Sequence, residues 1–230
     1  MVTGTTVTDV HEAATEVVVD TATDSWRADR LVACAGLQAD RVAAMAGIAV
    51  DVQIIPFRGE YYALPPHRAN LVTRLIYPIP DPALPFLGVH LSPTIDGGIT
   101  VGPNAVLGFA REKYRKGAVE PRDVLDYARF PGMWRVARAN VRTGIHEMKN
   151  SMFKRGYLTE CQKYCPELEL RDLLPREAGI RAQAVRRDGT LVHDFLVHRT
   201  PRSIHVLNAP SPAATSALPI GETLAEQLLP

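Results

Sequence analysis

A short apolar run that ends in small residues and passes directly into a helical pattern constrains the fold of this chain most. The run is Leu31-Val32-Ala33-Cys34-Ala35-Gly36, and its apolar residues have the spacing of a strand. Residues 37–46 then predict a short helix, with Gly47 suited to the position after its last turn. Small residues at such a turn let a flat or phosphate-bearing ligand approach backbone N–H groups, although most turns of this kind only bring helix and strand together. The sequence therefore predicts a strand-turn-helix unit here and leaves ligand binding open.

Strand-like segments lie on both sides of this unit. Polar turns separate the segments before it, as in a β-meander, and Gly97-Gly98 marks a tight turn within a later antiparallel layer. Near the end of the chain, residues 200–202 separate two further segments, and a loop of small residues leads into a helix over 220–229. The predicted strands cover residues 5–10, 16–20, 31–35, 61–64, 86–91, 99–102, 191–198 and 203–208.

The middle of the chain, residues 120–154, has a helical period. We expect one apolar face there to pack against the core: Trp134, Ala137, Val141, Ile145, Met148 and Met152. The opposite face is basic, with Arg135, Arg138, Arg142 and Lys149. Because basic amphipathic helices lie on membranes in some proteins, a peripheral membrane contact stays open beside this core interpretation. A shorter helix is predicted over residues 158–164, before Pro166.

Composition excludes several classes of protein. The 26 Lys and Arg residues balance the 25 Asp and Glu residues, so no global field attracts nucleic acid, which we do not expect as a partner. Three cysteines without a secretory apolar segment indicate free thiols and a cytoplasmic location. Cys161 and Cys165 lack a second cysteine pair, so no metal site is expected.

Several sequence blocks, in one order along the chain, carry a resemblance to a known family: residues 28–40, 56–62, 75–80, 87–94, 102–105 and 208–216. Over essentially its whole length, the chain resembles the carboxy-terminal part of FAD-dependent L-2-hydroxyglutarate oxidases, within the D-amino-acid-oxidase-like flavoprotein superfamily. The resemblance implies a mixed α/β (α+β) fold with a partial FAD-binding Rossmann-like domain, including a β-meander, and an antiparallel-sheet substrate domain with helices. The first domain would comprise residues 1–52 and 175–230, and the second residues 53–174.

One departure from the family pattern concerns the cofactor. Members begin with a β-α unit carrying G-x-G-x-x-G, whose glycines and helix N-terminus hold the FAD pyrophosphate. None of the sixteen glycines here forms a G-x-G. The chain therefore resembles a truncated enzyme, and a catalytically silent fragment that exposes apolar surface and self-associates is the alternative to an active one.

The resemblance implies which residues lie near FAD. Val7 would lie on a meander strand whose backbone meets the adenine, and Ala35 and Gly36 would pass close to the adenosine-pyrophosphate half. Backbone amides beside the flavin ring would stabilise the negative charge of the reduced flavin. The loop implied there comprises Asn208, Ala209, Pro210, Ser211, Ala213, Ala214, Thr215 and Ser216.

Oxidation of a 2-hydroxy acid needs a base for the hydroxyl proton and a cation for the carboxylate. His90, in the predicted strand 86–91, is the candidate base, with a structural histidine as the alternative. By the resemblance Arg181 would bind the substrate carboxylate, and Arg58 is a second candidate for the distal carboxylate of a dicarboxylate. Candidate hydroxyl donors, each with a core aromatic as the alternative, are Tyr61, Tyr77 and Tyr114.

The function that the resemblance implies is FAD-dependent oxidation of L-2-hydroxyglutarate to 2-oxoglutarate, with hydride transfer to flavin N5. Electrons would then pass to oxygen or a quinone, in the cytoplasm or at the inner membrane face. A related FAD-dependent amino acid or amine oxidase remains an alternative.

Overall fold

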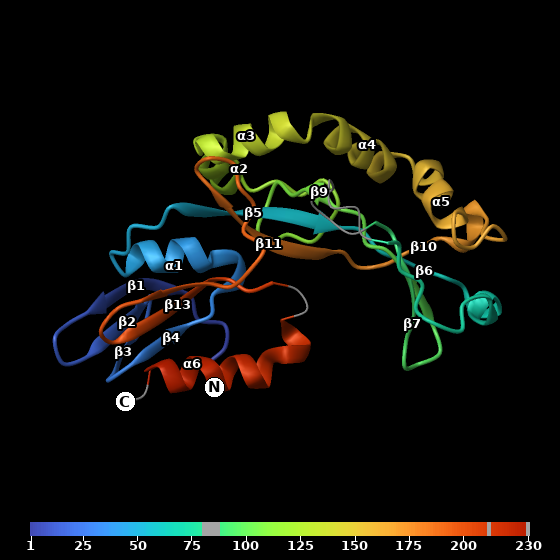
Figure 1. Cartoon of the computed structure of the whole chain (residues 1–230). Coiled ribbons are helices and arrows are strands. Elements are labelled where there is room, and N and C mark those ends of the chain that lie inside the picture. The colour runs from blue at the N-terminus through green and yellow to red at the C-terminus, as the bar shows by residue number, and fades with distance from the viewer. Residues whose placement is uncertain (80–87, 211–212, 229–230) are drawn as a thin grey trace. The chain divides into compact units, whose positions relative to one another are not determined.

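The computed structural model describes residues 1–79, 88–210 and 213–228 of the chain. It contains two compact units, one formed by Met1–Ile54 with Ala182–Pro230 and the other by Ile55–Arg181. Strands β5 (Val52–Gly59) and β11 (Gly179–Arg186) are neighbours in one sheet, and each passes from one unit into the other (Figure 1). The chain therefore crosses between the units on two paired strands.

Two three-stranded sheets form most of the first unit. An antiparallel meander has the order β1-β2-β3, where β1 is Val7–Glu12, β2 is Val17–Thr21 and β3 is Ser25–Ala28. The other sheet has the order β12-β13-β4, with bounds Leu196–Arg199, Ser203–Asn208 and Leu31–Ala33. β13 is antiparallel to β12 and parallel to β4. The carboxyl ends of β4 and β13 therefore lie at the same edge of this sheet.

The predicted strand-turn-helix unit is present in this first unit. A single 3₁₀ turn, η1 (Gly36–Gln38), follows β4 and leads into α1 (Ala39–Met45). Gly36 and Gly47 have φ values of 51° and 73°, so both adopt the left-handed backbone that glycine favours. The Asp40 carboxylate, buried in the first turn of α1, accepts a hydrogen bond of 3.0 Å from the backbone N–H of Ile54. This bond ties α1 to β5.

The core of the first unit comes from segments that are far apart in the sequence. α1 and the ends of β5, β11 and β13 contribute Ala39, Ala43, Ile48, Val52, Ile54, Ala184 and Leu207. On β13, Ile204 and Val206 pack with Leu224 of α6 (Ala217–Leu228). All six residues of β13 are buried, as is typical of a central strand.

The second unit has two small sheets. One has the order β10-β6-β8-β7, with bounds Leu174–Pro175, Tyr62–Ala63, Ile99–Val101 and Leu91–Pro93. β7 and β8 form an antiparallel hairpin around Gly97, whose φ of 80° confirms the predicted glycine turn. In the other sheet β9 (Val106–Leu107) pairs antiparallel with β5. Buried residues of these strands pack with Tyr157, Cys161, Cys165 and Leu168.

Four helices complete the second unit: α2 (Pro121–Ala128), α3 (Pro131–Ala139), α4 (Val141–Met152) and α5 (Lys154–Gln162). The predicted single apolar face over 120–154 is wrong, because the helix is interrupted at residues 129–130 and at Asn140, and each interruption changes the direction of the following side chains. Four residues expected in the core are instead half exposed: Trp134, Val141, Ile145 and Met152.

Two further expectations need correction. Strand β7 begins at Leu91, so His90 precedes a strand instead of lying within the predicted one over 86–91, of which residues 86–87 lie outside the described residues. β3, β5 and β11 were not predicted, because proline or charged residues interrupt their alternation. The strand predicted over 191–198 is wrong over most of its length, since β12 begins at Leu196.

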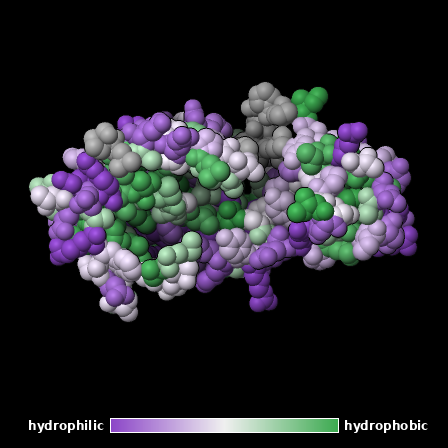
Figure 2. Space-filling view, turned by 90° about the horizontal axis from the view of Figure 1, so that it is seen from below, coloured by the Kyte–Doolittle hydropathy of each residue, from purple (hydrophilic) through white to green (hydrophobic). Residues whose placement is uncertain are grey.

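The face of the molecule in Figure 2 carries both hydrophobic and hydrophilic side chains. Among the described helices, none has both the length and the hydropathy needed to cross a membrane. Cys34 is exposed, whereas Cys161 and Cys165 are buried, and all three are free thiols.

Candidate functional site

Most of the described residues expected beside FAD lie in the first unit at one edge of the β12-β13-β4 sheet, whereas Val7 lies on the β1-β2-β3 meander. Because β4 and β13 are parallel neighbours, Ala35-Gly36 and the loop after Asn208 both follow strand ends at that edge. A Cβ added to Gly36 would meet no atom within 4 Å, so the backbone there is open to a ligand. An edge where parallel strands end in small residues is the usual nucleotide-binding place in α/β sheets.

The individual residues of this edge differ in what they do. The Asn208 side-chain amide donates to the backbone carbonyls of Val192 and Asp194, at 3.3 and 2.8 Å, so it holds the loop before β12. Val7 opens β1, opposite Thr21 on β2. Ala214, Thr215 and Ser216 form the 3₁₀ turn η4, which leads directly into α6. Ala209, Pro210 and Ala213 lie between β13 and η4, and Ser211 lies outside the described residues.

His90, the candidate base, lies in the second unit with its ring stacked on Tyr77. The ring centroids are 4.4 Å apart and the planes differ by 18°. His90 Nδ1 lies 3.3 Å from the carbonyl oxygen of Gly88. Since a carbonyl only accepts, Nδ1 carries the proton and Nε2 keeps its lone pair. Burial lowers the pKa of His90, so the ring stays neutral near pH 7.

Tyr61, which directly precedes β6, lies within electrostatic reach of Tyr77. Burial and the nearby Tyr77 raise the pKa of Tyr61, so its phenol remains a hydrogen-bond donor. Its backbone carbonyl accepts a 3.1 Å hydrogen bond from Arg176 N–H. Gly179, at the start of β11, lies beside the Tyr61 ring, and Arg181 follows two residues later on the same face of that strand. Desolvation lowers the pKa of Arg181, which nevertheless stays charged. The second unit thus brings His90, Tyr77 and Tyr61 together.

Arg58 is held in a buried polar cluster around Glu60. Its Nη1 lies 2.5 Å from Glu60 Oε1, and its Nε donates to the Tyr114 carbonyl at 3.2 Å. Glu60 Oε1 also accepts from Ser151 Oγ at 2.9 Å and lies 3.4 Å from Lys116 Nζ. The backbone N–H of Glu60 donates to Asn104 Oδ1 at 2.9 Å. The structure therefore gives Arg58 a partner within the protein.

A cavity of about 570 Å³ opens beside this cluster. We call it the cationic cavity, because Arg and Lys residues outnumber carboxylates in its wall. The cations are Arg58, Arg115, Lys116, Lys154 and Arg176, the carboxylates are Glu60 and Glu177, and the aromatic residues are Tyr61, Tyr62 and Tyr114. Such a wall favours a small anion with hydrogen-bonding oxygens.

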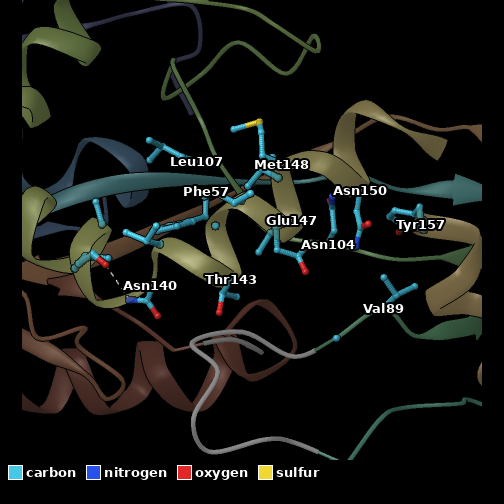
Figure 3. Close-up of a pocket in the computed structure, with 18 of the residues that line it drawn as sticks. Phe57, Val89, Asn104, Leu107, Asn140, Thr143, Glu147, Met148, Asn150 and Tyr157 are labelled. Atoms are coloured by element: carbon cyan, nitrogen blue, oxygen red, sulfur yellow. Dashed lines mark hydrogen bonds between the residues drawn. The ribbon is translucent and has the colours of Figure 1, made fainter. Parts of the chain in front are cut away.

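A second cavity, of about 440 Å³, is mainly apolar and lies along α4 (Figure 3). Leu107 and Met148 line it with apolar side chains, and Asn104 and Glu147 bring polar groups. Burial raises the pKa of Glu147, although a hydrogen bond from the Ala105 backbone opposes that shift. Asn140, between α3 and α4, is turned back onto α3, where its side chain donates to the Val136 carbonyl at 3.0 Å. This cavity suits an apolar group better than a dicarboxylate.

Sequence reasoning missed several residues of the cationic cavity. Arg58 and Glu60 are two apart on an extended segment, a spacing that places them on one face and could have indicated the pair. Lys116, Ser151 and Lys154 reach the site from distant segments, and no local pattern marks them. Among the described residues, no group of three or more His, Cys, Asp and Glu side chains is arranged to hold a metal ion.

Comparisons with known proteins agree with the resemblance seen in the sequence. The family described as FAD dependent oxidoreductase matches residues 1–227. The L-2-hydroxyglutarate dehydrogenase of Salmonella houtenae is 57% identical over 191 residues, which are 83% of this chain and 45% of that protein. The human mitochondrial L-2-hydroxyglutarate dehydrogenase is 42% identical over 217 residues, which are 92% of this chain and 47% of that protein. The chain spans about half the length of the curated relatives it matches.

Solved structures give the same fold. An L-alpha-glycerophosphate oxidase from Mycoplasma pneumoniae with FAD bound has a TM-score of 0.65 at 21% identity, covering 97% of this chain and 50% of that one. An L-proline dehydrogenase from P. horikoshii has a TM-score of 0.61 at 17% identity, covering 98% of this chain and 49% of that one. At these identities the likeness concerns the fold alone, and it confirms the predicted mixed α/β class.

Proposed function

This chain belongs to the family of FAD-dependent oxidoreductases, and from that premise we propose that it forms the substrate-binding part of an enzyme that oxidises L-2-hydroxyglutarate to 2-oxoglutarate. The observation that carries the proposal is the His90 ring, neutral and fixed in one tautomer beside Tyr77. The names of its relatives support the choice of substrate.

His90 acts as the general base in this proposal. The Gly88 carbonyl keeps the proton on Nδ1, so Nε2 receives the substrate hydroxyl proton. A protonated ring could not perform this step, and burial disfavours that form. Stacking on Tyr77 holds the plane of the ring, which keeps the direction of the Nε2 lone pair constant.

Arg181 and the tyrosines orient the substrate. A guanidinium binds a carboxylate with two parallel hydrogen bonds, and Arg181 supplies one on β11. Tyr61 is a protonated donor directly after the buried Glu60, and the Tyr77 ring stacks on His90. Arg58 contributes indirectly, since its ion pair with Glu60 fixes the segment that carries Tyr61.

The residues at the edge of the β12-β13-β4 sheet fit part of FAD. Gly36 leaves open space at the strand end, and η4 with α6 offers helix N-terminal N–H groups after a loop of small residues. The G-x-G turn that holds a pyrophosphate is not among these 230 residues. When bound, FAD would supply the acceptor for the hydride that leaves the substrate Cα. Ala35, Gly36 and the backbone of residues 208–216 would hold it.

Visible absorption spectroscopy tests this proposal. FAD is added under anaerobic conditions to the purified chain, alone and co-expressed with the amino-terminal half of the Salmonella houtenae relative. We expect bound flavin that bleaches with L-2-hydroxyglutarate and not with the D enantiomer. His90→Gln should slow bleaching by about 10²- to 10⁴-fold without changing FAD binding, whereas His67→Gln, at an exposed histidine, should change neither. Bound flavin that L-2-hydroxyglutarate leaves oxidised would refute the substrate, and no bound flavin in either sample would refute the FAD site.

The remaining partners are part of the same proposal. We propose oxygen or a quinone as the electron acceptor, in the cytoplasm or at the inner membrane face. The half-exposed Trp134, Ile145 and Met152 on α3 and α4 support contact with a second copy or with a lipid surface. Size-exclusion chromatography and vesicle flotation would distinguish these two contacts.

A further inference from the structure

The cationic cavity carries more positive charge than its own carboxylates neutralise. Glu60 is already shared by Arg58 and Lys116 and accepts a further hydrogen bond from Ser151. Within the described part of the chain, no carboxylate lies at ion-pair distance from Lys154, Arg176 or Arg115, which line the same wall. Among the described residues, these three cations of the cavity wall therefore have no carboxylate that neutralises them.

One of these cations is oriented by an aromatic ring, and a second has its backbone anchored at the cavity wall. Lys154 Nζ lies 5.7 Å from the centroid of the Tyr62 ring, an arrangement that orients the ammonium group. The backbone N–H of Arg176 donates to the Tyr61 carbonyl at 3.1 Å, which anchors this residue beside β6. Asp96 is near enough to Arg176 to be influenced by its charge, without forming an ion pair. The ring contact therefore lowers the loss of side-chain freedom when Lys154 binds an anion, and the anchored backbone keeps Arg176 at the cavity wall.

We propose that the cationic cavity binds the second carboxylate of a dicarboxylate through Lys154 and Arg176, and that these two residues select dicarboxylates over monocarboxylates. This inference rests on the proposed function for the identity of the substrate. Tyr61 connects the two regions, because it lines the cavity and lies within electrostatic reach of Tyr77, which stacks on His90. Arg58 is committed to Glu60, so selection falls to the cations without a carboxylate.

Isothermal titration calorimetry on the full chain tests the inference without flavin or turnover. Glutarate is the probe, and butyrate, with one carboxylate, is the comparison ligand. We expect glutarate to bind at least tenfold more tightly than butyrate, with an affinity that falls as NaCl is raised. Lys154→Met and Arg176→Met should each weaken glutarate binding about tenfold and leave butyrate binding unchanged. Arg155→Met is the matched control, since Arg155 is an exposed cation on α5 outside the cavity.

The outcomes separate this inference from the proposed function. Equal affinities for glutarate and butyrate, or glutarate binding that both cavity variants retain, would overturn the inference even if L-2-hydroxyglutarate bleaches the flavin. Selective glutarate binding that both variants lose would uphold it, even if no flavin reduction is observed. If Arg155→Met also loses glutarate binding, the attraction is nonspecific and depends on charge alone, which would likewise overturn the inference.

Discussion

The ion pair between Arg58 and Glu60 provides the sharpest test of how the site is built. The Arg58 side chain is 14% exposed and that of Glu60 is 7% exposed, so Arg58→Met leaves a carboxylate buried without its closest cation. Removing one partner of a buried pair costs about 3–5 kcal/mol. Lys116, 3.4 Å from Glu60 and about half exposed, remains as a weaker partner. We therefore expect the free energy of unfolding to fall by about 3 kcal/mol, the lower end of that range.

A double variant separates charge burial from the loss of contacts. In Arg58→Met with Glu60→Gln, no charge is left buried, and Ser151 keeps an acceptor. The remaining loss is the hydrogen bond from Arg58 Nε to the Tyr114 carbonyl, worth about 1 kcal/mol. The double variant should therefore be about 2 kcal/mol more stable than Arg58→Met alone.

Urea unfolding followed by circular dichroism measures both values. In thermal unfolding, the single variant should melt roughly 6–12 °C below the parent chain. If Arg58→Met is as stable as the parent chain, or if the double variant is the less stable of the two, Arg58 does not stabilise a buried Glu60. In that case Arg58 would again be the candidate for binding the distal carboxylate of a dicarboxylate substrate.

Further predictions concern pH and two glycines. Burial lowers the pKa of His205, so the unfolded chain, with a histidine pKa near 6.5, binds a proton that the folded chain does not, and the free energy of unfolding should fall as the pH drops below about 6.5. Burial acts to raise the pKa of Glu12, but hydrogen bonds from Thr200, Ser203 and the Arg202 backbone outweigh it and lower that pKa. The stability that the Glu12 carboxylate contributes should therefore be lost at still lower pH, when it becomes protonated. Urea unfolding measured from pH 8 to 4 checks both pH dependences. If the free energy of unfolding of His205→Gln changes with pH as it does in the parent chain, the assignment to His205 is contradicted. Gly156→Ala would place its Cβ 2.3 Å from Asn150 Oδ1 and should destabilise by about 1–3 kcal/mol. Gly144→Ala, in open space within α4, should instead stabilise by about 0.5–1 kcal/mol, and thermal melts of the pair compare them.

Local rules found the parts of the fold that depend on neighbouring residues. The β1–β2 pair, the Gly36 turn, α1 ending before Gly47 and the β7–β8 hairpin each follow from spacing and turn chemistry within a few residues, whereas β3, the third strand of the meander, was not predicted. The helical region failed because Pro131 at the first turn of α3 and the break at Asn140 restart the helical period, which no single hydrophobic stripe can represent. β5 was missed because its sequence, VQIIPFRG, contains a proline and an arginine that break the alternation of a strand. Its neighbours in the sheet, β9 and β11, are distant in the sequence.

The roles of the candidate site residues stay predictions. The structure stacks Tyr77 on His90, a contact that their separation of thirteen positions in the sequence does not indicate. The cations of the cationic cavity come from β5, the loop before α2, α5 and the segment before β11, so their proximity depends on the tertiary fold. Sequence spacing carries no information on such an arrangement.

Two of the sequence blocks that carry the family resemblance have a packing explanation as well as a chemical one. A Cβ on Gly59 would lie 2.7 Å from Pro103 Cβ, and one on Gly102 would lie 2.5 Å from the Tyr157 hydroxyl and 2.6 Å from the Glu60 carbonyl. Blocks 56–62 and 102–105 therefore pack too closely for any larger residue at these two positions. Tyr157 donates to the Glu60 carbonyl at 3.1 Å, so the same contact fixes the backbone between Glu60 and Tyr61. The glycines of these blocks thus act through the backbone, because they allow the close packing that fixes the segment carrying Glu60 and Tyr61.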